Sequence, residues 1–356
     1  MQCWPHMPTD QLRTAARSLW PVVVSMVCVL GGCDSSPDTA PTSDGVARQW
    51  TVVADKSPLG MWMSAVLVPD QPPLLVGGQA TLGAVASWDG NQEVPQNIPA
   101  GSLLTWGHST ADGETLVVGN GRRALWRDMT NTWIQEDLPA GDVLWGCVAH
   151  TRSDAWAVGA DKSVDAGQRP VLVHKTAAGW AVQTLPTLPA AQQSSQLYKI
   201  AAQSPNDMLV VGESGLALHW DGTSWQQEDP GVAENLVTAR PGPAGSYVVV
   251  GGLSKGVVLE RSNAGTWRVV ANTVVGLSGI DVFGSSVIVA GNYGWLQTLD
   301  RQTGVGQTVD DLPVTDTLHF VLRLPSGDAL AGGGNLAAWP GPMHGVLLQW
   351  ARPANP

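Results

Sequence analysis

The sequence predicts an all-β fold, a seven-bladed β-propeller with four strands in each blade. Short apolar runs end on glycine at intervals of about 40 residues, with one longer interval between Gly159 and Gly212. A repeat of this length built from short strands is typical of propeller blades, since each small sheet buries its faces only against its neighbours. The first glycines after the seven apolar runs are Gly77, Gly119, Gly159, Gly212, Gly251, Gly291 and Gly332.

The fourth repeat shows the strand pattern of one blade. Residues 196–202 are predicted as the inner strand, 208–212 as the second and 216–220 as the third. Asp221 and Gly222 form a hairpin signal, after which the outer strand begins at Ser224. Four short strands separated by turn residues match one blade.

The two ends of the predicted domain carry complementary parts of a blade. The seventh repeat stops after its third strand, at residues 346–350, and residues 47–53 look like an outer strand without a repeat of its own. Pairing these two strands closes the ring and removes an exposed sheet edge. We therefore predict one propeller domain over residues 47–352, with its last blade completed by the N-terminal strand.

Tryptophan dominates the aromatic residues, with 17 Trp against 3 Tyr and 2 Phe. Most tryptophans recur at the end of a third strand or the start of an outer strand, where a large flat ring can fill the wedge between neighbouring sheets. We expect this set to pack between blades: Trp88, Trp133, Trp180, Trp220, Trp225, Trp267 and Trp350.

The first residues look like an export signal rather than part of the fold. Positive charge at Arg13 and Arg17 precedes an apolar stretch, 19–30, that is too short to span a membrane. The following Leu30-Gly31-Gly32-Cys33 resembles the lipobox of bacterial lipoproteins, which implies a diacylglycerol on Cys33. We expect a lipoprotein signal peptide at 1–32, a flexible tether at 33–46 and anchoring in the inner or outer membrane of a bacterial cell envelope. The alternative is a cysteine buried in an ordinary signal segment.

Composition limits the class of partner. The formal net charge is −11, with 19 Lys and Arg and no basic cluster, so nucleic-acid binding is not expected. After cleavage, Cys147 has no intramolecular cysteine partner besides the acylated Cys33, and we expect it to be a small buried residue.

The segment Trp220-Asp-Gly-Thr-Ser-Trp225 and its weaker copies resemble the propeller repeats of exported bacterial proteins with BNR or Asp-box-like hairpins (WD40/YVTN-like repeats). Those families place S-x-D-x-G-x-x-W between the third and fourth strands. Here the leading Ser is absent, and the copy from Ser262 to Trp267 lacks the Asp. The resemblance covers residues 47–352 as architecture and carries over no catalytic residue.

Enzymatic signatures are sparse. The arginine triad that accompanies a tyrosine nucleophile in sialidase-type propellers is not found around Tyr198, Tyr247 or Tyr293. The histidines show no H-x-H or HExxH spacing, and no glycine-rich turn opens a helix, so we expect no metal site, no phosphate cradle and no cofactor.

One pattern favours a binding site. Aromatic residues begin four successive inner strands, and polar residues occupy the turns between second and third strands, which lie on the same face. Together they could stack on a sugar ring or clamp a peptide; the alternative is that the aromatics plug the channel. The predicted ligand-binding residues are Trp62, Trp106, Trp145, Tyr198, Asn120, Glu213, Asn292 and Tyr293.

The leading functional hypothesis is an anchored, exported lipoprotein whose propeller is a non-enzymatic protein- or glycan-binding module or an envelope scaffold. The turn at 299–304 is similar to the repeat turn of lipoprotein propellers in outer-membrane protein assembly. The alternative is a glycan-processing hydrolase or lyase with its site at the channel mouth, where Asp161 and Glu213 are the available carboxylates. A quinone-dependent oxidoreductase is a third class, for which the sequence offers no basic, metal-liganding pocket.

Overall fold

The computed structural model describes residues 47–163 and 167–352. The predicted signal peptide at 1–32, the lipidation site Cys33 and the tether at 33–46 lie outside the described residues.

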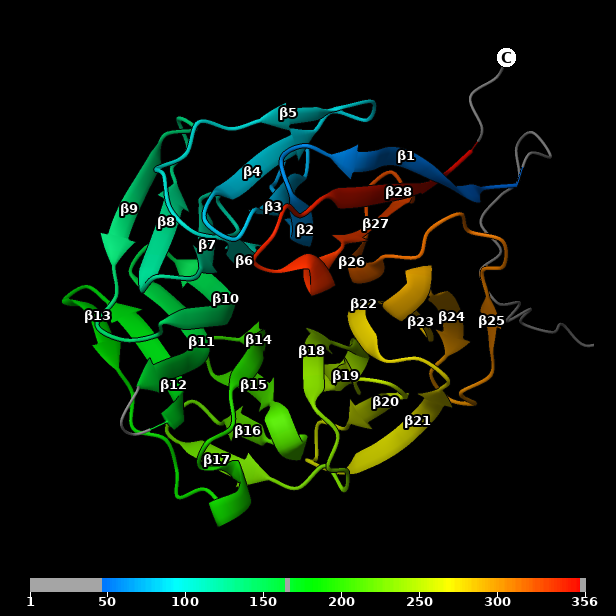
Figure 1. Ribbon diagram of the computed structural model, residues 1–356. Helices are drawn as coiled ribbons and strands as arrows, with labels where there is room; N and C mark the ends of the chain where they lie inside the picture. The colour runs from blue at the N-terminus through cyan, green and yellow to red at the C-terminus, as the bar shows by residue number, and fades with distance from the viewer. Residues whose placement is uncertain (1–46, 164–166, 353–356) are drawn as a thin grey trace, which may run out of the picture. The chain divides into compact units, whose positions relative to one another are not determined.

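Seven four-stranded antiparallel sheets form a ring, which confirms the predicted seven-bladed propeller (Figure 1). The first strand of each blade surrounds the central axis and the fourth lies at the perimeter. Blade 1 consists of β2(Met61–Val66), β3(Leu74–Gly78), β4(Gly83–Trp88) and β5(Glu93–Pro95). Blade 2 consists of β6(Leu104–Ser109), β7(Thr115–Gly119), β8(Arg123–Arg127) and β9(Trp133–Asp137). Blade 3 consists of β10(Val143–Thr151), β11(Asp154–Ser163), β12(Gly167–Thr176) and β13(Gly179–Val182).

Blades 4 to 6 repeat this arrangement, with short 3-10 turns in several connections. Blade 4 consists of β14(Leu197–Ser204), β15(Asp207–Gly212), β16(Ala217–Trp220) and β17(Trp225–Glu228). Blade 5 consists of β18(Leu236–Pro241), β19(Tyr247–Gly251), β20(Gly256–Arg261) and β21(Trp267–Thr273). Blade 6 consists of β22(Leu277–Phe283), β23(Ser286–Gly291), β24(Leu296–Asp300) and β25(Gly306–Thr308). The 3-10 turns are η1(Ala190–Gln192), η2(Glu213–Gly215), η3(Pro243–Gly245), η4(Asn292–Gly294) and η5(Leu336–Ala338).

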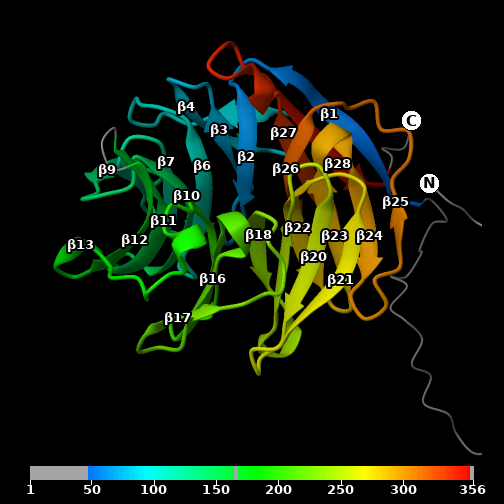
Figure 2. The same cartoon turned by 60° about the horizontal axis from the view of Figure 1, so that its bottom comes forward.

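Blade 7 is assembled from both ends of the domain, as predicted. It contains β26(Thr317–Arg323), β27(Ala329–Gly334), β28(Gly345–Ala351) and the N-terminal β1(Gln49–Ser57). The strand β1 runs antiparallel along β28, from the pair Gln49–Ala351 to the pair Ser57–Gly345, and Figure 2 shows the two side by side. The closing strand continues four residues beyond the predicted end at residue 53.

The repeating glycines are explained by a close backbone approach. A Cβ atom on Gly119 would lie 2.2 Å from the carbonyl oxygen of Leu103, and one on Gly212 would lie 2.2 Å from that of Gln196. Only glycine fits where the second strand passes the start of the inner strand this closely. In blade 7 this position belongs to Gly333, whose Cβ would lie 1.8 Å from the Thr317 oxygen, so the sequence pattern placed it one residue early at Gly332.

Each inner strand contains a register shift just after the residue that pairs with the closely approaching glycine, so that one residue is left out of the ladder. A bulge of this kind redirects the side chain of the extra residue. The bulge residues are Met63, Thr105, Trp145, Tyr198, Val237, Ser278 and His319.

The hydrophobic core lies between the blades. For example, one cluster joins Trp126 of blade 2 to Val173 of blade 3, and another joins Trp156 of blade 3 to Leu218 of blade 4. Of the tryptophans expected to pack between blades, six lie in or against these clusters: Trp88, Trp133, Trp180, Trp220, Trp225 and Trp267. Trp350 lies instead under the guanidinium of Arg48, 5.4 Å from its ring centre.

Candidate functional site

The ring has two faces, which we name after the direction of the inner strands. The start face, where inner strands begin, carries the turns between second and third strands, such as η2 and η4. The end face, where inner strands finish, carries the turns between first and second strands, such as residues 67–73 and 110–114. The predicted binding site belongs to the start face.

Two of the predicted aromatics meet there. Trp145 and Tyr198 are the bulge residues of neighbouring inner strands, and their rings make an edge contact with centroids 6.0 Å apart. Both side chains are half-buried. Because they occupy the same register in successive blades, the shared bulge explains why they come together.

The predicted carboxylate Glu213 holds this pair in place. Tyr198 Oη donates to Glu213 Oε1 over 2.8 Å, and the indole N–H of Trp145 donates to Gln196 Oε1 over 2.7 Å. Gln196 in turn donates to both Glu213 oxygens, one through its backbone and one through its side chain, and Gln168 adds a fourth donor. Burial, together with the Glu213 hydrogen bond, raises the pKa of the Tyr198 hydroxyl. With four donors on two oxygens, the Glu213 carboxylate is an anchor for the aromatic pair.

The other two predicted aromatics occupy different registers. Trp62 pairs with Gly77, has an exposed fraction of 0% and donates to Glu93 Oε1 over 2.8 Å, within the core between blades 7 and 1. Trp106 lies one position beyond the bulge and is 4% exposed. The expected arc of four equivalent aromatics is therefore reduced to Trp145 and Tyr198. Both lie 14 residues before their glycine, at the bulge, whereas Trp62 lies 15 and Trp106 13 residues before theirs.

Trp106 contacts cations that come from inner strands of other blades. Lys199 Nζ lies 3.5 Å from the centre of the Trp106 ring and Arg240 Cζ lies 5.2 Å from it. Lys199 also donates to the carbonyl oxygen of Trp145 over 3.0 Å. Burial and the neighbouring Arg240 charge lower the pKa of Lys199 well below its usual value. Since β6, β14 and β18 line the axis, the side chains of Trp106, Lys199 and Arg240 lie in the central channel. For Trp106 this arrangement favours the alternative interpretation, in which an aromatic side chain plugs the channel.

Two histidines of the inner strands are buried as well. Burial lowers the pKa of His108 to about 4, with contributions from the Arg240 and His150 charges, and lowers that of His319 to about 4, with a contribution from Lys199. His108 Nδ1 accepts a hydrogen bond from the Ala149 backbone over 3.3 Å. Both imidazoles are therefore neutral near pH 7.

The remaining predicted residues lie around the rim of the start face. Asn292 donates to the Leu253 carbonyl over 2.7 Å and accepts from Thr317, while Tyr293 projects with 76% of its surface exposed. Asn120 forms an isolated backbone bridge with Val143. The structure thus groups Trp145, Tyr198 and Glu213, and it leaves Asn120, Asn292 and Tyr293 apart from them.

Part of the longer interval between Gly159 and Gly212 is regular structure. Residues 161–163 and 167–170 extend β11 and β12, whose pairing continues to Ser163–Gly167. Asp161 accepts from the Gly141 backbone over 2.8 Å and lies 3.5 Å from Arg122 Nη2. Asp161 therefore ties two connections together on the rim.

A feature that the sequence reasoning missed is a set of exposed large apolar side chains on the start face, which we call the start-face arc. Their exposed fractions range from 37 to 76%, and all lie in connections of blades 5, 6, 7 and 1. Isolated apolar residues in turns carry no periodic signal, which is why the sequence did not indicate them. The start-face arc consists of Leu253, Val274, Tyr293, Leu336, Trp339 and Leu82.

Hydrogen bonds connect the turns that carry the start-face arc. The Asn292 contact with Leu253 links blades 5 and 6, and Gly294 N donates to the Asp316 carbonyl over 2.8 Å. His344 Nε2 lies 3.0 Å from Asp316 Oδ2, and Gln79 Nε2 donates to the carbonyl of Met343 over 2.6 Å, which joins blade 7 to blade 1. The arc therefore rests on a continuous, ordered rim.

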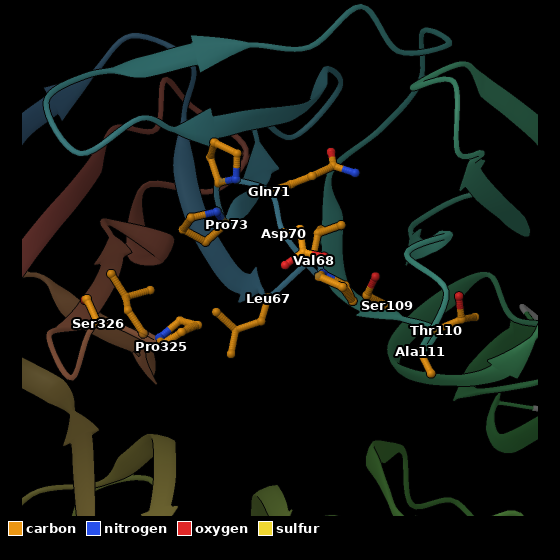
Figure 3. A pocket seen from close by; sticks show the side chains of 13 residues that line it. Leu67, Val68, Asp70, Gln71, Pro73, Ser109, Thr110, Ala111, Pro325 and Ser326 are labelled. Carbon is orange, nitrogen blue, oxygen red and sulfur yellow. The ribbon is translucent and has the colours of Figure 1, made fainter.

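The end face holds a broad hollow of about 780 Å³, shown in Figure 3. Leu67 points into it, and Pro325 and Ser326 of blade 7 lie opposite Ser109 and Thr110 of blade 2. Asp70 is the one carboxylate among the lining residues. An open, proline-rich hollow of this kind offers apolar contact but no acid–base pair.

Neither a metal site nor a membrane-crossing helix is found in the part of the chain that the structure describes. No group of three or more His, Cys, Asp or Glu side chains there could hold a metal ion. No helix there has the length and apolar character needed to cross a bilayer.

Comparison with known proteins identifies the fold alone. No family model and no curated protein matches the chain. Solved propellers do match: a streptogramin B lyase is 12% identical, with a TM-score of 0.65, and the match covers 84% of this chain and 97% of that chain. The structure of YCF48 bound to D1 peptide is 15% identical, with a TM-score of 0.60 and coverage of 86% of this chain and 99% of that chain. The WD40 β-propeller domain of Doa1 is 10% identical, with a TM-score of 0.61 and coverage of 86% of this chain and 98% of that chain. At these identities the fold is shared, which fits a binding or scaffold module, and propellers host many activities.

Proposed function

We propose that this chain is a protein-docking module that presents the start-face arc to a second polypeptide. The observation that carries the proposal is the presence of six exposed large apolar side chains in the start-face connections of four successive blades. Exposed apolar surface framed by polar residues is characteristic of interaction sites. The hydrogen-bonded rim beneath them preorganises the surface, which lowers the entropic cost of binding.

Charge indicates the chemistry of the partner. The connection from β25 to β26 crosses the start face beside η4 and exposes Asp310 and Asp311, and the chain carries a net charge of −11. An acidic frame around apolar anchors favours a partner with apolar side chains set among Lys and Arg, because opposite potentials steer association. Among solved propellers of this fold, YCF48 holds a peptide, which supports polypeptide binding as a use of such a ring.

Glycan binding is the second candidate, because the half-buried rings of Trp145 and Tyr198 meet on the same face. Aromatic rings fixed by hydrogen bonds suit stacking on a sugar. Alanine at Trp145 is expected to weaken glycan binding without unfolding the domain. The hydrolase or lyase alternative gains less support, since Glu213 already accepts four hydrogen bonds.

We place this module at a bacterial envelope through the proposed lipid anchor on Cys33, because Gly31-Gly32-Cys33 follows an apolar stretch. The test is metabolic labelling of cells with an alkyne fatty acid. Label is expected on the full chain and on the Cys28→Ser control, and its loss is expected in Cys33→Ser. Equal labelling of both variants would contradict the anchor and leave the docking proposal untouched.

Docking is tested by photocrosslinking in cells that express the full chain. A photoreactive amino acid replaces Tyr293 on the start face or, as the matched control, Met129, which is exposed on the end face. We expect a discrete protein adduct from position 293 alone, and its loss when Leu253→Asp is added. The same adducts from both positions, or an adduct that survives Leu253→Asp, would contradict the proposal.

A further inference from the structure

Neighbouring blades are joined near the perimeter by a recurring ion-pair arrangement, which we call the clamp. Between blades 2 and 3, the Glu136 oxygens of β9 each lie 2.6 Å from Lys175 Nζ of β12. The indole N–H of Trp180 also donates to Glu136 over 2.8 Å. Although burial alone would raise the pKa of Glu136, these contacts outweigh it and lower that pKa. The clamp therefore consists of a carboxylate, a cation and an indole N–H.

The same clamp closes the junction between blades 4 and 5. Glu228 of β17 receives two hydrogen bonds from Arg261 of β20, at 2.5 and 2.7 Å, and one from the indole of Trp267 at 2.9 Å. Glu228 lies three residues after Trp225, just as Glu136 lies three after Trp133. The cations also correspond, because Lys175 and Arg261 pair across the sheet with residues four places before the anchor glycine.

The junction between blades 3 and 4 lacks the clamp. Its equivalent positions hold Gln183, three residues after Trp180, and Trp220, which pairs with Met208 four places before Gly212. An aromatic cluster takes the place of the ion pair. Trp156 stacks on the His174 ring, with centroids 3.7 Å apart and planes 10° from parallel, and Trp220 and Trp225 each lie 5.6 Å from Trp156.

A cavity of about 290 Å³ opens beside this cluster on the end face. Asp154 and His174 lie in its wall, with His174 Nε2 2.9 Å from Asp154 Oδ1. The remaining lining combines aromatic and small polar side chains, a composition suited to a ligand with both an apolar face and hydroxyl groups. The lining residues are Ser153, Asp154, Trp156, His174, Thr176, Pro205, Asn206 and Trp220.

The next blade contains a filled copy of this site. His219 and Asp207 repeat the pair at the same separation of 2.9 Å, and there the hydroxyl of Tyr247 donates to the Asp207 backbone oxygen at 2.8 Å and to its carboxylate at 3.0 Å. The residue in the place of Tyr247 at the cavity is Met208, which has no hydroxyl. Within the described residues the Asp154 side chain is hydrogen-bonded to His174 alone, and it is 36% exposed.

We propose that the cavity between blades 3 and 4 binds one neutral pyranose residue of a saccharide. A sugar hydroxyl takes the position that the Tyr247 hydroxyl occupies in the filled copy and donates to Asp154. The apolar face of the ring lies against Trp220, and Thr176 and Asn206 serve further hydroxyls. An anionic sugar is disfavoured by the Asp154 charge. This site is on the face opposite the start-face arc, so the two proposals stand or fall separately.

The test is binding of methyl glycosides to the full chain, measured by saturation-transfer NMR and calorimetry. The probes are the methyl pyranosides of glucose, galactose, mannose and N-acetylglucosamine, with tetramethylammonium as the organic-cation control. We expect at least one glycoside to bind with a millimolar or lower Kd. Trp220→Ala and Asp154→Asn should each weaken it about tenfold or more, the effect of losing one well-placed contact.

Further variants separate the site from general effects. Met208→Tyr is expected to abolish glycoside binding, because it supplies the tyrosine found in the filled copy. If Met208→Tyr misfolds, the glycoside affinity of Asp154→Asn still tests the proposal. Val305→Ser, at an exposed position between β24 and β25 of blade 6, should bind like the wild type. The proposal is overturned if no glycoside binds, if tetramethylammonium alone binds, or if Asp154→Asn and Trp220→Ala bind as the wild type does.

Discussion

The junctions between blades 4 and 5 and between blades 3 and 4 use one backbone arrangement for different purposes. The first buries a carboxylate, a guanidinium and an indole N–H in mutual contact, and Arg261 is left 3% exposed. The second has Gln183 and Trp220 at the same positions and retains a cavity. Because each sheet packs against the sheets of its two neighbours, one junction near the perimeter can exchange an ion pair for an open site without disturbing the others.

The largest expected effect comes from breaking a clamp. Glu228→Ala leaves the buried Arg261 charge unpaired, which should lower the free energy of unfolding by about 3 to 5 kcal/mol. The equivalent change at the unclamped junction, Gln183→Ala, should cost about 0.5 kcal/mol or less. Urea unfolding followed by circular dichroism measures both, and equal losses would show that the two junctions do not differ energetically.

Acid stability separates the clamps from the channel. His108 and His319 have folded-state pKa values of about 4, below the ordinary 6.5, so the unfolded chain binds more protons between these values. The contribution of each histidine to the free energy of unfolding is therefore fully present above pH 6.5 and decreases as the pH drops towards 4. Below pH 4 the decrease levels off, after a loss of about 3 kcal/mol per imidazole. The clamp carboxylate Glu136 has a pKa below its ordinary value of 4.5, so its contribution to stability is lost as the pH falls from that ordinary value through the lowered one.

The variant His319→Gln, which does not titrate, tests this assignment. Thermal unfolding measured from pH 7 to 4 should show a shallower decline than in the wild type. Glu136→Gln should leave the slope unchanged in the upper part of that interval, above the ordinary glutamate pKa of 4.5. A slope that responds to Glu136→Gln and not to His319→Gln would locate the acid sensitivity in the clamps instead.

Grafting a clamp into the open junction should have an intermediate effect. Gln183→Glu and Trp220→Arg each place an unpaired charge near the cavity, and each should destabilise the domain. Together they should interact favourably, with a coupling free energy of about 1 to 3 kcal/mol in a double-mutant cycle. The double variant should also lose glycoside binding; additivity of the two changes would mean that the backbone geometry of this junction does not support a clamp.

The smallest effect is expected on the start-face arc. Tyr293→Ser and Leu253→Ser change side chains that are more than 70% exposed, so the free energy of unfolding should shift by about 0.5 kcal/mol or less. Leu253→Ser should also reduce crosslinking from the photoreactive residue at position 293. A large loss of stability would assign these side chains to the fold rather than to docking.

The fold was predictable because its strongest physical constraint is written in the sequence. In each second strand, a Cβ atom on the constrained residue would lie about 2 Å from a carbonyl oxygen of the inner strand, so only glycine fits. Six of the seven repeat glycines identified in the sequence are this constrained residue. Ring closure also followed from the orphan strand before residue 57. The exception at Gly333 arose because three consecutive glycines hid which one makes the close approach.

The site was less predictable because a difference of one residue in spacing decides whether a side chain lies in the ladder or at the bulge. Trp62, Trp106 and Trp145 lie 15, 13 and 14 residues before their glycines, and they occupy three registers. The clamps had a usable signal, a glutamate three residues after an outer-strand tryptophan in blades 2 and 4. The glutamine at this position in blade 3 marks the junction without a clamp. The sequence alone does not indicate this, because it does not show that Lys175, Arg261 and Trp220 occupy equivalent positions in space.

The pairing of β1 with β28 has a consequence during synthesis on the ribosome. Thr51 and Gln349 are hydrogen-bonded across this seam although they are 298 residues apart in the chain. At a synthesis rate of roughly 5 to 20 residues per second, β28 is made on the order of 15 to 60 s after β1. Throughout that interval β1 has no β28 to pair with, and only the emergence of Ala351 allows the ring to close.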